Sequence, residues 1–199
     1  EISADRLALR GEDLLAMDDR ALTRIRGRHV AMVYQDPMSA LNPVLRVGEQ
    51  VAEVLRRHRG LSAPAAWARS VALFERVHLP DPGRIARRYP HQLSGGQQQR
   101  VVIAMAIACE PDLLIMDEPT TGLDVTTEAV ILELIRELRA SMGAAVLFIS
   151  HNLAVVANVC DRVGVLYAGK LVEEGATGQV LHAPRHPYTI GLLAAIPRP

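Results

Sequence analysis

Residues 93–100 read LSGGQQQR, and their types and order suit the binding of an anion. Ser94 supplies a hydroxyl, and Gly95 and Gly96 have no side-chain bulk; directly after them, at Gln97, an apolar periodic run begins. At the start of a helix the backbone N–H groups point outward, and the helix dipole favours negative charge. The segment therefore predicts a phosphate-binding helix start.

A second group of reactive residues lies in LLIMDEP, residues 113–119. An apolar run that ends in Asp117 and Glu118 is typical of a buried parallel strand whose carboxyl end meets solvent. Because consecutive side chains of an extended chain point to opposite sides, the two carboxylates have different tasks open to them. Asp117 can hold a hydrated Mg²⁺, and Glu118 can accept a proton from an attacking water. By itself, the sequence Asp-Glu-Pro would indicate only that a strand ends in polar residues.

The elements that must position these residues alternate between strands and helices. Apolar runs at 30–34, 113–116 and 145–149 predict buried strands, and residues 2–9 could form another. Helices are expected after residue 124, with an apolar face that includes Val130 and Leu134, and from 152 to about 159. Strands separated by helices imply a mainly parallel sheet that binds ligands at the carboxyl ends of its strands. Residues 163–167 and 170–173 are typical of a hairpin.

Residues 38–99 differ from the rest because helices punctuated by proline and glycine dominate there. We expect helices at 47–59, from about 64 to before 80, and around 84–89. Trp67, Val71 and Phe74 have helical spacing and are expected in the core of this insertion rather than in a base-stacking surface.

Composition and residue spacing argue against several classes of protein and of binding site. Twenty-two basic and 22 acidic residues leave no net charge, so no overall field favours nucleic acid. Cys109 and Cys160 lack metal-type spacing and are expected to be reduced thiols. No apolar run approaches the roughly 20 residues that span a bilayer. His182 and His186 are separated by Pro184, which argues for a surface loop rather than a metal site.

Five motifs in order carry a resemblance over essentially the whole chain. VYQDP, LSGGQQQR, LLIMDEP, GLD at 122–124 and ISHN at 149–152 resemble the Q-loop, signature motif, Walker B, D-loop and H-loop of ABC transporter nucleotide-binding subunits. Within that family the chain looks most like the ATPases of oligopeptide, dipeptide and nickel importers. The implied fold is α/β, a P-loop NTPase-like ABC ATPase core with a mainly parallel sheet and an inserted helical subdomain.

The resemblance also implies roles for individual residues. Glu118 would be the general base, Asp117 the acid associated with Mg²⁺, and His151 a group that touches the γ-phosphate. Gln35 would meet Mg²⁺ and the attacking water, and Asp124 would belong to the dimer contact, although many aspartates at helix starts are only N-caps. The signature residues would bind the ATP that a second subunit holds; these are Ser94, Gly95, Gly96 and Gln97.

Two departures from the family pattern matter. Asn152 follows His151 where an acid is common, and no G-x-x-x-x-G-K-[ST] loop occurs in the 199 residues. We therefore expect an N-terminally truncated piece that is inactive by itself. Its expected parts are a remnant of the catalytic core ending in the Q-loop (1–37), a helical subdomain (38–99), an α/β core (100–173) and the start of a C-terminal extension (174–199).

The function implied is ATP hydrolysis that energises the import of a peptide or a related small solute, with ATP and Mg²⁺ as cofactors. The partners would be a second nucleotide-binding domain, identical or related, transmembrane permease subunits and, indirectly, a solute-binding protein, without nucleic acid. Permease helices would dock near Gln35 and the helical insertion, at the cytoplasmic face of the plasma membrane. Two alternatives stay open: a soluble ABC ATPase that acts on ribosomes or DNA, and a catalytically silent dimer module. The sequence does not rank the possible solutes.

Overall fold

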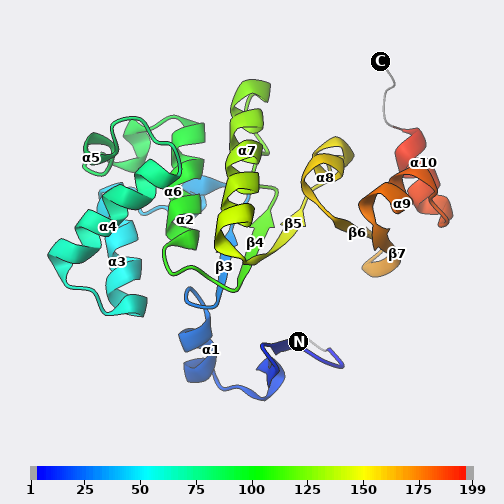
Figure 1. The fold of residues 1–199 in the computed structure, drawn as a ribbon, viewed down its shortest axis with the longest axis horizontal. Helices are drawn as coiled ribbons and strands as arrows, with labels where there is room; N and C mark the ends of the chain where they lie inside the picture. The colour runs from blue at the N-terminus through cyan, green and yellow to red at the C-terminus, as the bar shows by residue number, and fades with distance from the viewer. Residues whose placement is uncertain (1–3, 196–199) are drawn as a thin grey trace. The chain divides into compact units, whose positions relative to one another are not determined.

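The computed structural model describes residues 4–195 (Figure 1). Its contacts divide the chain into two compact units, Glu1–Leu147 and Phe148–Pro199. Residues 2 and 3 of the strand expected at 2–9 lie outside the described residues; in the rest of that stretch only β1 (Ala8–Leu9) forms, paired with β2 (Glu12–Asp13). A short 3₁₀ turn (Leu14–Ala16) and α1 (Asp19–Ile25) follow, and neither was expected.

The central sheet has the order β3-β4-β5 and is built from β3 (Val30–Val33), β4 (Leu113–Asp117) and β5 (Ala145–Ile149). β3 and β4 are parallel, and Val33 lies opposite Met116. Because parallel strands end at the same edge of a sheet, the residues that follow β3 and β4 lie close together. The sheet thus brings the Gln35 loop to the Asp117–Glu118 pair across more than 80 residues of sequence.

The opposite end of the sheet is held by His29 and Asp112. The backbone N–H groups of Asp112 and Leu113 both donate to the carbonyl oxygen of His29, at 2.9 and 3.0 Å. The His29 ring nitrogen Nδ1 lies 2.7 Å from Asp112 Oδ2, and Ala145 donates its N–H to the Asp112 carbonyl at 2.9 Å. These bonds fix the register of β3 against β4, so they also fix the distance between the residues at the other end.

The burial of β5 differs from expectation. Its wholly apolar sequence predicts a strand covered on both faces, yet Leu147 is 51% and Ile149 43% exposed. The reason is position, since β5 is an edge strand in the described sheet and the other two strands carry the buried residues Val33, Leu114 and Met116.

The helical insertion begins with α2 (Pro37–Ala40) and α3 (Val47–Arg59), continues with α4 (Ala63–Arg76) and α5 (Pro82–Ile85), and ends in a 3₁₀ turn (Pro90–Gln92). α3 has the expected bounds because Gly60 adopts the left-handed conformation that ends helices, with φ of 65°. The third helix lies earlier than the expected 84–89, since Pro82 starts it and its last residue is Ile85. Of the three side chains expected in the core of the insertion, Phe74 is fully buried, whereas Trp67 and Val71 are only half-buried.

Gly48 marks the tightest point of this insertion. A Cβ there would lie 2.7 Å from the Ala86 carbonyl oxygen and 2.9 Å from Trp67 Cζ3. We expect Gly48→Ala to lower the free energy of unfolding by roughly 1–3 kcal/mol, because the backbone of Ala86 must shift. Gly83→Ala is the matched control, with nothing within 4 Å of its new Cβ. Urea unfolding of both variants measures the difference, and equal stabilities would show that the close approach is not there.

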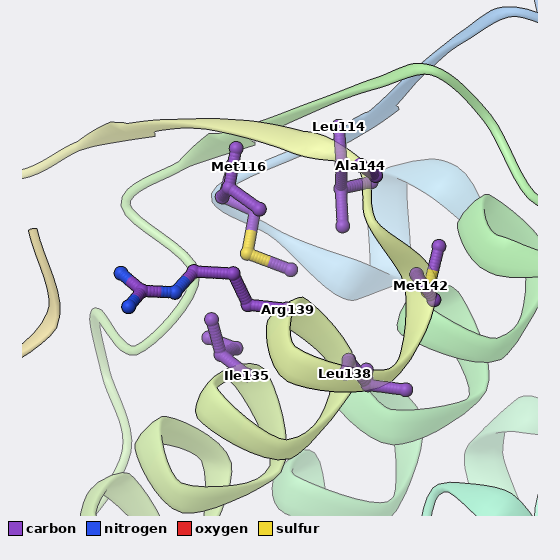
Figure 2. A pocket seen from close by; sticks show the side chains of 8 residues that line it. Leu114, Met116, Ile135, Leu138, Arg139, Met142 and Ala144 are labelled. Atoms are coloured by element: carbon purple, nitrogen blue, oxygen red, sulfur yellow. The ribbon is translucent and has the colours of Figure 1, made fainter.

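Two longer helices begin directly after Ser94 and Asp124, which are both candidate site residues. α6 (Gly95–Ile107) is buried along most of its length, and α7 (Val125–Met142) buries Ile131, Leu134, Ile135 and Leu138 as expected, whereas Val130 stays 39% exposed. α7 ends at Gly143 in the left-handed conformation. Figure 2 shows the side chains that line a small apolar hollow where α7 meets β4, among them Leu114, Met116, Ile135 and Leu138.

The second unit contains α8 (Leu153–Val159), a hairpin of β6 (Arg162–Tyr167) and β7 (Lys170–Ala176), α9 (Thr177–His182) and α10 (Pro187–Ala194). The hairpin is antiparallel as expected, and its turn residues Ala168 and Gly169 both have positive φ. Glu173 on β7 accepts N–H donors from Arg185 at 2.7 Å and His186 at 3.0 Å, which attaches the start of α10 to the hairpin.

Three further observations concern the cysteines, the candidate metal ligands and the length of the helices. Cys109 is buried and Cys160 partly buried, and burial raises the pKa of Cys109. In residues 4–195 no group of three or more His, Cys, Asp or Glu side chains could hold a metal, and His186 instead accepts the Tyr188 N–H through Nδ1. No helix in the same range has the length and apolar character needed to cross a membrane.

Candidate functional site

Glu118 does not continue the strand that carries Asp117. β4 ends at Asp117, and the next residue, Glu118, turns into the left-handed region with φ of 44°. A non-glycine residue in this region costs on the order of 1–3 kcal/mol and is held there by its surroundings. We expected the side chains of Asp117 and Glu118 to alternate as in an extended chain. Glu118 departs from this expectation, because the turn of its backbone sets the direction of its side chain.

The Glu118 carboxylate is oriented by two donors from different segments. Gln35, just beyond β3, donates from Nε2 to Glu118 Oε2 at 3.1 Å, and the Thr121 hydroxyl donates to the same oxygen at 2.9 Å. Both hydrogen bonds lie at the exposed surface, where a substrate can reach them. Gln35 and Glu118, predicted separately, are thus in direct contact, and Thr121 joins them. The sequence analysis did not single out Thr121. The signal that could have identified it is a hydroxyl side chain three positions after Glu118.

The loop that carries Gln35 is also held at the point where it leads into α2. Asp36 accepts the Met38 N–H at 3.0 Å, and this side-chain cap starts α2 at Pro37. Gln35 therefore lies between a sheet strand and the first helix of the insertion. Only the capping residue Asp36 stands between Gln35 and the first residue of α2.

The donor set at this edge suits magnesium. Mg²⁺ in phosphate-transferring sites takes one or two protein ligands besides phosphate oxygens and water. The Asp117 carboxylate and the Gln35 amide oxygen are ligands of this kind at adjacent strand ends. The chemistry of these two side chains suits the ion, and its binding by Asp117 and Gln35 stays a prediction.

The LSGGQ segment forms the helix start that its residue types predict. Ser94 caps α6 and forms a capping box, in which its Oγ accepts the Gln97 N–H at 3.4 Å and its N–H donates to Gln97 Oε1 at 3.1 Å. Gly95 and Gly96 are the first two residues of α6, and the first N–H groups of an α-helix have no acceptor within the helix. They are the donors available to an anion.

Asp124 caps α7. Its Oδ1 accepts the Thr127 N–H at 2.9 Å and its Oδ2 accepts the Thr127 hydroxyl at 2.6 Å. The hydroxyl, followed by the N–H, lowers the pKa of Asp124. The N-cap role that aspartates at helix starts often have is thus confirmed, while the role in a dimer contact stays a prediction.

His151 belongs to the second unit. It lies exposed between the end of β5 and Asn152, whose side chain caps α8 by accepting the N–H groups of Ala154 and Val155. Asn152, which departs from the common family pattern, is thus the residue that starts α8. The contact of His151 with a γ-phosphate stays a prediction.

The chain belongs to the ABC transporter family. The model of that family matches residues 3–121, and a second model, described as the oligopeptide/dipeptide transporter C-terminal region, matches residues 172–199. The family expected from the five motifs is thereby confirmed, and so is the α/β ATPase fold with its parallel sheet.

Curated relatives cover the whole chain. A putative peptide import ATP-binding protein of Brucella melitensis is 51% identical over 202 residues, which span 99% of this chain and 60% of the relative. A dipeptide transport ATP-binding protein of Bacillus subtilis is 48% identical over 198 residues, at 100% and 59% coverage. A glutathione import ATP-binding protein of Salmonella paratyphi A is 50% identical, at 94% and 30% coverage. The chain thus spans about 60% of the length of the first two relatives.

A solved structure gives the same fold. A dimeric ATP-binding cassette in a post-hydrolysis state, bound to ADP and phosphate, superposes with a TM-score of 0.75 at 32% identity, covering 85% of this chain and 72% of the other. A second dimeric cassette described as a bacterial ABC transporter cassette superposes with a TM-score of 0.73 at 33% identity, covering 83% and 70%.

Proposed function

We propose that this chain is part of an ATP-hydrolysing subunit that energises the import of peptides or a related small solute through separate membrane subunits. One observation carries the proposal. Gln35 and Glu118, which follow two parallel strands, are joined by a hydrogen bond beyond the carboxyl ends of these strands, where the fold class binds its ligands. The match of residues 172–199 to an oligopeptide/dipeptide transporter region supports peptide import over an action on ribosomes or DNA.

The residues divide the chemistry among them. Glu118 accepts the proton of the attacking water, and its orientation by Gln35 and Thr121 holds one carboxylate oxygen in place. Asp117 and Gln35 would hold Mg²⁺, which neutralises charge on the phosphate oxygens when bound. His151 donates a hydrogen bond to the γ-phosphate. Gly95 and Gly96 bind the phosphate of ATP that the second subunit of a head-to-tail dimer holds.

The helix start at Ser94 needs no lysine of its own chain, because the phosphate that it meets is held elsewhere. Hydrolysis is accordingly a property of the full-length protein paired with a second ATP-binding domain, identical or related.

A hollow beside the Gln35 loop is the surface that we assign to the permease. It is lined by residues of the insertion and of α6: Ala40, Asn42, Leu45, Gln50, Glu53, Val54, Arg57, His58 and Met105. Its rim is preformed, because the buried Gln50 side chain accepts the Asn42 N–H at 2.8 Å and donates to the Asn42 and Leu45 carbonyls, both at 3.0 Å. Next to it Val44 is 74% exposed. A fixed rim of mixed polar and apolar side chains, with the exposed Val44 beside it, is suited to a helix of the permease.

The lining of the hollow carries one acidic and one basic side chain, Glu53 and Arg57. Burial, followed by the charges of Arg57 and Arg28, lowers the pKa of His58, which favours its neutral form. The mixed lining offers a partner segment both a hydrogen-bonding donor and a carboxylate acceptor. Docking at this hollow would place the permease next to Gln35, and hence next to the reacting phosphate.

Val44→Asp is expected to weaken the association with the permease by about tenfold or more, since a charge would enter an apolar contact. The matched control is Leu15→Asp, which puts the same charge on an apolar residue that is also exposed, at 46%. Co-purification of the two variants with the permease in detergent measures the effect, and thermal unfolding checks that both are folded. Equal recovery of permease with both variants would exclude this hollow as the docking surface.

Phosphate release by the full-length protein, assembled with its permease at the cytoplasmic face of the membrane, tests the function as a whole. We expect release to require both ATP and Mg²⁺. Absence of hydrolysis in the intact complex, or co-purification with ribosomes or DNA in place of membrane proteins, would contradict the proposal.

A further inference from the structure

We propose that Thr127 is a positioning residue, which links Asp124 to the phosphate-binding helix start of its own subunit by packing on Gly96. The inference rests on the proposed function, in which the helix start at Ser94 meets the phosphate of a partner's ATP. It adds a route within one chain from the D-loop to that helix start.

The starts of α6 and α7 pack against each other. Figure 1 shows the two helices side by side, and contacts join them within the first unit. The first glycine faces Leu123, whose Cδ2 would lie 3.7 Å from a Cβ on Gly95. At Gly96 a Cβ would overlap the Thr127 methyl carbon Cγ2. Gly96 is therefore required by packing inside this chain, whatever anion binds in front of it.

Thr127 is held by the residue that caps α7. Its hydroxyl donates to Asp124 Oδ2 at 2.6 Å and its N–H donates to Asp124 Oδ1 at 2.9 Å. Hydrogen bonds to an ionised carboxylate are among the stronger ones, so the side-chain rotamer of Thr127 follows the Asp124 carboxylate. The methyl group on the same Cβ is thereby aimed at Gly96.

A movement of the Asp124 carboxylate is therefore passed to the start of α6. Asp124 is exposed and is the residue expected to meet a partner subunit. When its carboxylate turns toward a partner group, the bond to the Thr127 hydroxyl changes and the methyl group moves against Gly96. The N–H groups of Gly95 and Gly96 shift with it, and misplacement of binding groups by about 1 Å can cost on the order of 10²-fold in rate.

A pair of substitutions tests the packing step. Gly96→Ala in the full-length protein is expected to lower kcat/KM for ATP on the order of 10–100-fold. Adding Thr127→Ser removes Cγ2, after which the nearest remaining atoms of residue 127 lie 3.8 and 3.9 Å from the new Cβ. The double variant should therefore recover most of the loss. Thr126→Ser, an exposed neighbour, is the control and should not rescue Gly96→Ala.

A third substitution tests the link to Asp124. Thr127→Val keeps the methyl group and removes the hydroxyl, so we expect kcat to fall severalfold with little change in melting temperature. Wild-type kcat in Thr127→Val would overturn the link, and failure of Thr127→Ser to rescue Gly96→Ala would overturn the packing step.

The outcome separates the inference from the proposed function. If the wild-type complex hydrolyses ATP but the rescue fails, only the role of Thr127 is wrong. If the wild-type complex does not hydrolyse ATP, the proposed function fails, and the melting temperatures of the same four variants still test the contact. Recovery of the melting temperature in the Gly96→Ala and Thr127→Ser double variant supports the contact, and no recovery refutes it.

Discussion

Replacing Glu118 by glutamine is expected to slow ATP hydrolysis by the full-length protein on the order of 10²–10⁴-fold and to leave ATP binding intact. Glutamine has the same shape, and its amide oxygen can still accept hydrogen bonds from Gln35 and Thr121, as Glu118 Oε2 does at 3.1 and 2.9 Å. It cannot take a proton from water. The geometry of the site is therefore kept while the base is lost. Steady-state phosphate release and equilibrium binding of ATP measure the two effects separately.

Glu128→Gln is the matched control. Glu128 lies on α7 and accepts the Thr120 hydroxyl at 3.0 Å, so the change removes a carboxylate of the same type from a neighbouring segment. We expect its hydrolysis rate to stay within about threefold of wild type, as for a surface substitution outside the reacting groups. A wild-type rate in Glu118→Gln would show that another group is the base.

Replacing Phe74 by alanine is expected to lower the free energy of unfolding by about 3–5 kcal/mol. Phe74 is 0% exposed and is among the largest fully buried side chains of the insertion, together with Leu55 and Leu73. The cost combines the lost burial of the ring with the cavity left behind, because packed surroundings relax only in part. Such a loss is a large fraction of the stability of an ordinary domain.

Glu75→Ala on the same helix serves as the control for Phe74→Ala. Its side chain is exposed, and the change should alter stability by less than about 0.5 kcal/mol. Urea titration followed by circular dichroism gives both values. A loss below about 1 kcal/mol for Phe74→Ala would contradict the packing of the insertion described above.

Local signals in the sequence predicted much of the fold. The helix at 47–59 was predicted to the residue, because an amphipathic run ends at Gly60 and the glycine takes the left-handed conformation. α1 was missed, although Asp18 caps it by accepting the Ala21 N–H, because its seven residues bury no side chain and hence give no strong apolar period. The burial of β5 was overestimated because an apolar run reports hydrophobicity and not the number of neighbouring strands.

The candidate site was predicted as residue types but not as geometry. Asp117, Glu118, Gln35 and Asp124 were singled out, yet nothing local shows that Gln35 donates to Glu118 across 83 positions. That contact depends on the pairing of β3 with β4, which only tertiary structure supplies. The left-handed turn at Glu118 was also hidden, since glutamate rarely adopts it.

Gly96 is a second example of a requirement that only the tertiary structure shows. The sequence explains it by the approach of a phosphate, whereas the structure adds a contact with Thr127 that leaves no space for a Cβ. Two residues 31 positions apart thus share one requirement, and no periodicity or spacing reveals it.

Simultaneous measurement of peptide uptake and phosphate release tests the central claim most directly. The full-length protein is reconstituted in liposomes with its permease, a second ATP-binding domain and the solute-binding protein, and labelled di- and oligopeptides are offered. We predict that ATP drives peptide uptake with the wild-type subunit and that Glu118→Gln abolishes uptake and phosphate release together. Uptake that persists in Glu118→Gln, or hydrolysis that never moves a peptide, would contradict the account.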